Sequence, residues 1–162
     1  MGPRHSPGAV LAASLAYHRD MPTLTSALPE HVRRFLSEPR FATVATVDDD
    51  GAPRQAVVWF LFDGDTIVIN SLEGRRWPTN LRRDPRVSIA ITDAVAQAWV
   101  GLSGTVEVVD DQAQAQADIA AMARRYEEPD EAEAVIATRF SKQQRVSFRL
   151  RPAAIHDHLK NG

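Results

Sequence analysis

The sequence of 162 residues contains no cysteine. This absence excludes a disulfide framework, thiolate metal sites and thiol catalysis, and it favours a reducing, cytoplasmic location. No apolar run reaches the length of about 20 residues that a membrane-spanning helix needs. The net charge is only -2, which indicates no overall attraction to nucleic acid or to an anionic membrane surface. Hydrophobic residues make up 44% and charged residues 25%, so the composition is that of one ordinary globular domain.

The first part of the chain lacks the patterns of a folded domain. We predict a loose extension over residues 1–25 and a single domain over residues 26–162. The apolar stretch 9–16 is short for a signal peptide and is followed by charged residues without a small-residue cleavage pattern; export stays the alternative. A cap candidate at residues 25–26 precedes a predicted helix that ends before Pro39.

Apolar alternation and turn residues predict an antiparallel, mainly β (α+β) fold. The predicted strands are residues 41–47, 54–62, 66–71, 87–92, 99–109 and 145–151, the first three forming two successive hairpins. The predicted helices cover parts of residues 28–38, 73–86, 111–128 and 130–140. In the helix at 111–128, we expect Asp118 to lie off the apolar face. Long antiparallel strands with few helices favour a small barrel, because closure protects the strand edges.

Charge is distributed unevenly along the chain. Residues 75–86 contain five arginines and one acid, whereas residues 107–133 contain nine acids and two arginines. The basic segment begins where a strand gives way to a helix, so residues 74–76 combine free backbone N–H groups with guanidinium groups, and Asn80 adds an amide one turn later. This pattern predicts an anion site. The alternative is a solvated basic helix that pairs with surface acids.

Aromatic residues are the second unusual feature. The predicted strand 54–62 is largely apolar on both faces, so it is either buried on both sides or part of a subunit contact. Trp99 is followed by the small residues Gly101 and Ser103, which leave room for a planar ligand or for a closely packed neighbour. The alternative for each tryptophan, taken singly, is a place in the core.

Motifs for other chemistries are missing. The sequence has no nucleophile elbow, P-loop or Rossmann glycine pattern. His156 and His158 flank an aspartate but lack a third ligand nearby, so we predict no metal site. No acid or base stands out as a catalytic group. An enzyme with this sequence would need a bound cofactor for its chemistry.

Three segments together resemble a known superfamily. They are ATVDDDGAPRQAVVWFLFDGD, GRRWPTNLRRDPRVSIAI and WVGLSGTVEV. They look like the flavin and deazaflavin split-barrel proteins related to pyridoxamine 5'-phosphate oxidase, and most of all like the coenzyme F420-dependent branch of mycobacterial and other actinobacterial reductases. The resemblance covers about residues 28–157 and is most specific over 80–87. It implies a homodimeric split β-barrel of six to seven strands with a few flanking helices, and two cofactor sites at the dimer interface.

The resemblance also carries residue roles. Arg75 and Asn80 match residues that hold the cofactor phosphate. Asn70 and Ser71 match the strand end beside the ring and ribityl chain. Trp99 matches an aromatic residue that the second subunit brings to the site. The cofactor-binding residues expected from the pattern and the resemblance are Val57, Trp59, Asn70, Ser71, Gly74, Arg75, Arg76, Trp77, Asn80 and Trp99.

One departure leaves the cofactor open. Family members often have a lysine three residues before the asparagine, where this chain has Trp77. The first hypothesis is a reductase that passes a hydride from reduced F420 to a small organic acceptor. The others are an oxidoreductase that uses flavin mononucleotide (FMN) and a non-catalytic F420 storage protein. Counterparts of the oxidase substrate-phosphate residues are missing near the C-terminus, which disfavours pyridoxamine phosphate oxidation.

Overall fold

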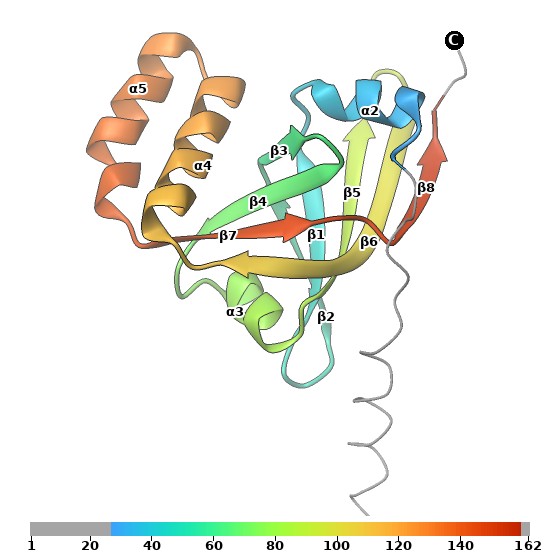
Figure 1. The fold of residues 1–162 in the computed structure, drawn as a ribbon, viewed down its shortest axis with the longest axis horizontal. Helices are drawn as coiled ribbons and strands as arrows, with labels where there is room; N and C mark the ends of the chain where they lie inside the picture. Colours follow the sequence, from blue (N-terminus) through green and yellow to red (C-terminus); the bar gives the residue numbers. More distant parts are fainter. Residues whose placement is uncertain (1–26, 160–162) are drawn as a thin grey trace, which may run out of the picture.

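The structure is a computed structural model, of which residues 27–159 are described (Figure 1). The predicted extension 1–25 and the cap candidate at 25–26 lie outside these residues. The elements in chain order are α2 (Glu30–Ser37), β1 (Ala42–Val47), β2 (Pro53–Val58), β3 (Phe60–Asp63), β4 (Thr66–Leu72), α3 (Arg76–Arg83), β5 (Arg86–Asp93), β6 (Ala98–Val109), α4 (Gln112–Tyr126), α5 (Pro129–Thr138), the 3-10 turn η1 (Phe140–Lys142), β7 (Arg145–Leu150) and β8 (Ala154–His158).

The strands form one curled antiparallel sheet. Its order is β2-β1-β5-β6-β7-β4-β3, and β8 pairs with the first half of β6. The two outermost strands, β2 and β3, are consecutive in the chain and separated only by Trp59. Because a single residue links these two edge strands, the sheet has to curl until its edges approach each other. The mainly β, split-barrel architecture expected from the sequence is confirmed.

Two predictions about strands are wrong. The segment 54–62 is not one strand: β2 pairs with β1, whereas β3 pairs with β4, and the chain changes partner at Trp59. Alternation continues through this residue, so the pattern shows no break. The strand at 145–151 is not the last one either, because β8 follows it and brings the sheet to eight strands. β8 is mostly polar and half-exposed, so its sequence lacks the apolar alternation that predicts a strand.

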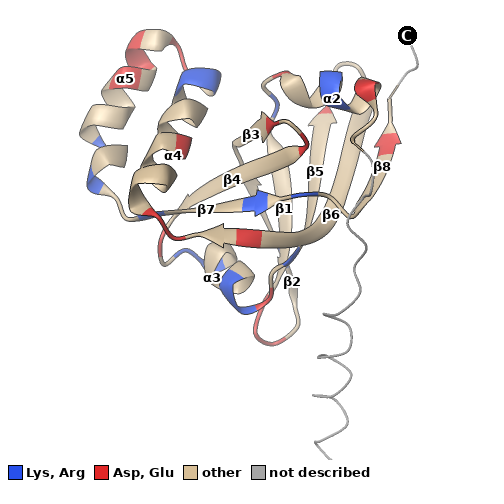
Figure 2. Ribbon diagram, in the orientation of Figure 1, with Lys and Arg blue, Asp and Glu red and all other residues tan. Residues whose placement is uncertain are grey.

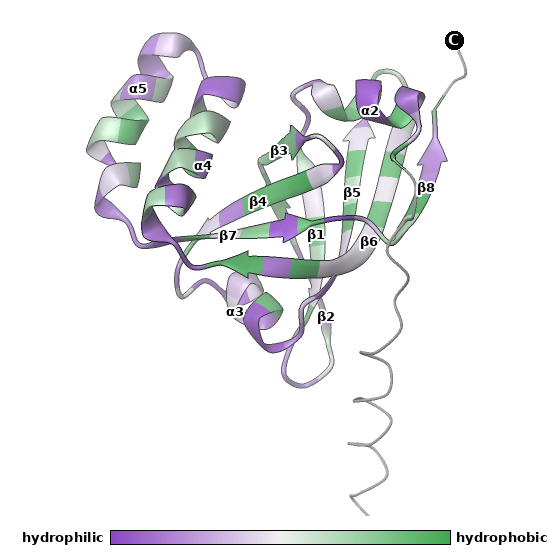
Figure 3. Ribbon diagram, viewed as in Figure 1, coloured by the Kyte–Doolittle hydropathy of each residue, from purple (hydrophilic) through white to green (hydrophobic). Residues whose placement is uncertain are grey.

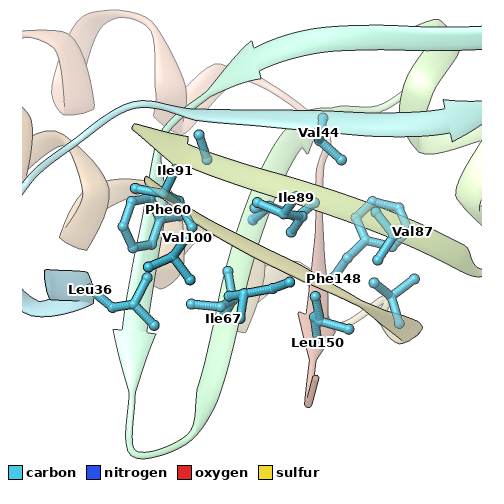
Figure 4. Packing of buried hydrophobic residues seen from close by; sticks show 14 of the residues in the cluster. Leu36, Val44, Phe60, Ile67, Val87, Ile89, Ile91, Val100, Phe148 and Leu150 are labelled. Atoms are coloured by element: carbon cyan, nitrogen blue, oxygen red, sulfur yellow. The ribbon is translucent and has the colours of Figure 1, made fainter. Parts of the chain in front are cut away.

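The interior of the curled sheet holds the main core. Alternate residues of β1, β5, β6 and β7 point into it together with Leu36 of α2 (Figure 4). Val146, Phe148 and Leu150 lie in this core, as their alternation predicts. The apolar colouring in Figure 3 follows the same strands, whereas much of α2 and α5 is hydrophilic.

The helical hairpin of α4 and α5 packs on the outside of β4 and β7 (Figure 1). Ile119, Met122 and Ala123 form a second apolar cluster there with Val68 of β4. The expectation for Asp118 is wrong, since this residue is buried at 6% exposure and accepts a hydrogen bond from Gln114. Between residues 27 and 159, no helix combines the length and the apolar character that crossing a bilayer requires.

Candidate functional site

A groove of about 600 Å³ runs between β2, the start of α3, the middle of α4 and the segment that leads into β7. Its lining includes six of the predicted cofactor residues: Val57, Trp59, Asn70, Arg75, Arg76 and Trp77. The other four, Ser71, Gly74, Asn80 and Trp99, do not line it. The fold therefore brings residues from distant parts of the sequence to one concave surface.

One end of the groove is aromatic. The indole of Trp59 stacks on the ring of Tyr126, with centroids 5.3 Å apart and planes 5° apart. The ring of Phe41 lies 5.8 Å from that of Tyr126 and is largely exposed. The Tyr126 hydroxyl donates to the carbonyl of Arg40 (2.7 Å), and burial raises the pKa of Tyr126. The hydroxyl thus stays protonated and holds a fixed platform beside the exposed Val57.

The other end of the groove is cationic. Arg75, Arg139 and Arg145 line it, and the groove lining includes no aspartate or glutamate. Arg145 is buried at 7% exposure; its Nε donates to Asn70 Oδ1 (2.8 Å) and its Nη1 to Gln143 Oε1 (2.6 Å). Burial lowers the pKa of Arg145 to about 10, and the charges of Arg75 and Arg139 act in the same direction. The guanidinium is still cationic at neutral pH.

Two further groove arginines, Arg54 and Arg76, share one acid, which partly cancels their charge. Asp48, whose side chain is 1% exposed, accepts from Arg54, from Arg76 (Nε to Oδ1, 2.9 Å) and from Asn80 (Nδ2 to Oδ1, 2.8 Å). The hydrogen bonds from Arg76 and then Arg54 hold the pKa of Asp48 well below its usual range. Figure 2 shows basic residues of α3 near the acidic β1–β2 turn. Asp48 therefore fixes the hairpin to the start of α3.

The start of α3 has the geometry of an anion site. Arg75 is extended and immediately precedes the first helical residue, and no side chain caps this end. The first N–H groups of a helix have no partner within it and lie at the positive end of its dipole. Gly74 has φ of 81°, and a Cβ added there would meet no atom within 4 Å. Glycine is favoured here by the backbone conformation rather than by crowding.

The remaining predicted residues have other surroundings. The buried Asn80 donates to Thr46 Oγ1 (3.1 Å) as well as to Asp48, so its amide is directed at the β1–β2 hairpin. Ser71 follows Asn70 on β4 and therefore lies on the opposite, interior face, where its hydroxyl finds no partner among the described residues. Trp99 is 42% exposed on β6 and stacks on His158 at 6.3 Å.

Trp77 belongs to the core as well as to the groove. It is 8% exposed, and its ring lies 5.6 Å from that of Phe148. The sequence hypothesis of a core position for a single tryptophan holds for this one. Most of its surface is therefore used in packing, and only its edge is left for the groove.

Three residues of the cationic end were not predicted. Arg139 and Gln143 come from the segment between α5 and β7, and Arg145 is the first residue of β7. Alternation placed Arg145 on the polar face of its strand, which a sequence pattern treats as solvent-facing. The helical hairpin covers that face instead. Within residues 27–159, no cluster of three or more His, Cys, Asp or Glu residues is arranged to hold a metal ion.

Comparison with protein families gives one match. The family model described as pyridoxamine 5'-phosphate oxidase matches residues 28–159. No curated protein sequence matches the chain significantly.

Solved structures with the same fold are numerous. One described as an F420 reductase is 25% identical, with a TM-score of 0.64, and the match covers 80% of this chain and 98% of that one. A conserved hypothetical protein from Mycobacterium tuberculosis is 23% identical with a TM-score of 0.66, over 87% of this chain and 96% of that one. A heme storage protein from Vibrio cholerae is 22% identical with a TM-score of 0.62, over 81% of this chain and 94% of that one. The last two show the shared fold alone.

Proposed function

Because this chain belongs to the pyridoxamine 5'-phosphate oxidase family, we propose that it is an F420-dependent oxidoreductase that transfers a hydride from the reduced deazaflavin to a small organic acceptor. The similarity to a structure described as an F420 reductase supports the choice of cofactor. We further propose that the protein works as a cytoplasmic homodimer.

The observation that carries this proposal is the difference between the two ends of the groove, one aromatic and the other cationic. Tyr126 marks the aromatic end, and Gln116 of the same helix contacts the segment that carries the cationic end. Ten residues of α-helix separate them, which corresponds to about 15 Å. F420 and FMN both join a planar ring to a phosphate, so a groove with an aromatic end and an acid-free cationic end fits either molecule.

The cofactor supplies the hydride when it is bound, and the chain supplies binding and orientation. In this proposal Arg75, Gly74 and the first N–H groups of α3 hold the phosphate. Val57 and Trp59 lie under the ring, and Asn70, whose amide donates to Ala115 and Ser147, lines the groove and holds Arg145 in place. Asn80 acts through Asp48, which keeps Arg76 at the mouth of the groove. These groups position the ring and limit the access of water to it.

The proposed dimer contact is the outer face of the sheet. Paired positions on this face are occupied by small residues: Thr43 opposite Ala90, Ala90 opposite Gly101, Ala45 opposite Ser88, and Ser88 opposite Ser103. Such a surface is smooth enough for a second copy to approach closely. Val57 and Trp99 project from it, at 69% and 42% exposure. We propose that Trp99 completes the site of a dimer rather than that of one protomer, whereas Ser71, at 1% exposure on the interior face, is out of a partner's reach.

FMN is the second candidate cofactor. The specific observation in its favour is Trp77, which stands where family members often have a lysine and which is buried against Phe148. A buried indole contributes no charge to a long anionic cofactor tail. Storage of F420 is the third candidate function. Oxidation of reduced F420 in the presence of an acceptor distinguishes the oxidoreductase from a storage protein.

The test is a titration of the purified protein with F420 and, separately, with FMN, followed by fluorescence quenching. We expect F420 to bind, and its reduced form to be oxidised when an acceptor is added. Arg75→Ala should weaken binding at least about tenfold without changing the melting temperature, because Arg75 is exposed, lines the groove and forms no ion pair within residues 27–159.

Arg82→Ala is the matched control. Arg82 is on the same helix but pairs with Glu73 and Asp110 outside the groove, so its loss should leave binding unchanged. Failure of both cofactors to bind would refute the proposal. Binding of F420 without any turnover would refute the reductase hypothesis and favour the storage role.

A further inference from the structure

We propose that Arg145 is the centre of an oxyanion-binding corner, beside the start of α3, that takes a carboxylate or phosphate of the groove's ligand. The inference deepens the proposed function, on which it rests only for placing a ligand in this groove. It does not require that the ligand be F420.

The first support is the electrostatic surroundings of Arg145. Arg145 as a residue is only 7% exposed, so its guanidinium loses much of its hydration, and its two side-chain partners, Asn70 and Gln143, are neutral. No carboxylate of the described residues lies within ion-pair distance of it. The ring of Phe140 lies 5.1 Å from the guanidinium carbon.

The second support is like charge. The charges of Arg75 and Arg139 act on Arg145 in the direction that disfavours its cationic form. Three cations that converge without an acid destabilise the free protein and are relieved only when an anion joins them. By contrast, Arg54 and Arg76 share the carboxylate of Asp48.

The third support is the rigidity of the corner. Two glutamines of α4 hold its backbone: Gln116 donates to the carbonyls of Phe140 (2.9 Å) and Gln143 (2.7 Å), and Gln112 donates to that of Gln143 (3.2 Å). The Oε1 atom of Gln112 in turn accepts from the backbone N–H of Arg145 (3.1 Å). Preorganised donors bind an anion with little loss of conformational entropy.

The fourth support is the unused part of the guanidinium. Hydrogen bonds engage Nε and Nη1, while Nη2 has no partner among the described residues. Arg145 lines the groove, and Nη2 is not among the fully buried atoms without a partner, so this donor remains for a ligand in the groove. A carboxylate or phosphate oxygen there would receive charge-assisted hydrogen bonds.

The test uses the full-length protein and measures how inorganic phosphate and citrate shift its melting temperature. We expect both anions to raise the melting temperature of the wild type, and the increase to be lost in Arg145→Gln. Arg145→Lys, which keeps the charge without the planar fork, should retain part of the increase. Arg149→Gln is the matched control, since Arg149 is on the same face of β7 but outside this groove, and it should retain all of the increase.

The melting temperature without added anion distinguishes a binding role of Arg145 from a structural one, because loss of a structural residue would lower it. We expect Arg145→Gln to melt at or above the wild-type temperature, because the change removes an uncompensated buried charge while glutamine keeps the hydrogen-bonding capacity. Persistence of the anion-dependent increase in Arg145→Gln would overturn the inference, and so would the absence of any increase in the wild type. A response to phosphate alone assigns the corner to a phosphate, and a response to citrate alone assigns it to a carboxylate.

The outcome is separable from that of the proposed function. If neither F420 nor FMN binds but the anion effect depends on Arg145, the corner stands and the proposed function falls. If F420 binds equally well to Arg145→Gln and the wild type, and the anion effect is unchanged, the corner falls and the proposed function stands.

Discussion

Two groups of arginines line the same groove, and they differ in what compensates their charge. At the wall formed by β2 and α3, Arg54 and Arg76 share the buried carboxylate of Asp48. At the end formed by α3 and the start of β7, Arg75, Arg139 and Arg145 have no acid beside them in the groove. We call the first group the paired arginines and the second the unpaired arginines.

This difference shows that an arginine in a groove is not by itself an anion site. An anion that approaches the paired arginines meets a charge that is already partly cancelled, and it must compete with a carboxylate that holds them in place. An anion at the unpaired arginines meets three charges that repel one another until it arrives. The paired arginines therefore stabilise the fold, and the unpaired arginines are available to bind an anion.

The largest expected effect, on the melting temperature, comes from removing the carboxylate that the paired arginines share. Asp48→Asn keeps the shape of the side chain but removes the charge that holds Arg54, Arg76 and the β1–β2 hairpin together. We expect the melting temperature to fall by several degrees and the affinity of the groove for phosphate to rise, both measured by thermal melts with and without phosphate. Asp49→Asn changes the net charge equally at an exposed neighbour and should do neither. An unchanged melting temperature in Asp48→Asn would contradict the comparison.

The same variant has a pH signature. The pKa of Asp48 is lowered in the folded protein, so its contribution to stability is fully present above the unfolded value of about 3.9. That contribution is lost as the pH falls toward the folded pKa, because the unfolded chain binds the proton more readily. The difference in melting temperature between the wild type and Asp48→Asn should thus narrow below about pH 4. A constant difference over that range would show that the charge of Asp48 is not the cause.

A middle-sized effect should come from supplying an acid to the unpaired group. Arg139 is exposed, so Arg139→Glu places a carboxylate near Arg145 without disturbing the core. We expect the affinity for phosphate or for the cofactor to fall about tenfold, or about 1.4 kcal/mol, as measured by titration. Lys142→Glu makes the same charge change at an exposed residue that does not line the groove, and its effect should be much smaller. Equal effects of the two variants would mean that only net charge matters.

The smallest effect should come from removing a paired arginine. In Arg54→Ala, Asp48 keeps its bonds from Arg76 and Asn80, and no binding charge is lost from the unpaired end. The affinity for the cofactor should change by less than about twofold, within the range of surface ion pairs. A tenfold loss measured in the same titration would place the anion at the paired wall instead.

The sequence predicted most of the strands because half-buried antiparallel strands alternate. Val146, Phe148 and Leu150 have the same alternation in the sequence as in the core. The break at Trp59 escaped prediction because alternation is local: it records which side a residue faces and not which strand lies beside it. The buried Asp118 escaped for a related reason, since Gln114 supplies it with a hydrogen bond that no apolar pattern records.

The candidate site was predictable only in part. Glycine before a run of arginines indicated the start of α3, and Arg75 and Arg76 do line the groove. Their different surroundings were not predictable, because Asp48 lies 28 residues before Arg76 and the contact exists only after folding. Arg145 gave no signal at all, as a charged residue on the polar face of a strand is ordinarily solvent-facing.

The sequence by itself determined the class of fold, the absence of thiol chemistry and the location of one cationic segment. Each of these depends on composition or on short-range periodicity, which the chain carries before it folds. Only the tertiary structure decided which arginines are compensated and which are not. The α4–α5 hairpin covers the polar face of β7 and buries Arg145 there, while the β1–β2 turn brings Asp48 to Arg76. Electrostatic interactions act through space and depend on burial, so a near-neutral sequence folds into a groove with two electrically different groups of arginines.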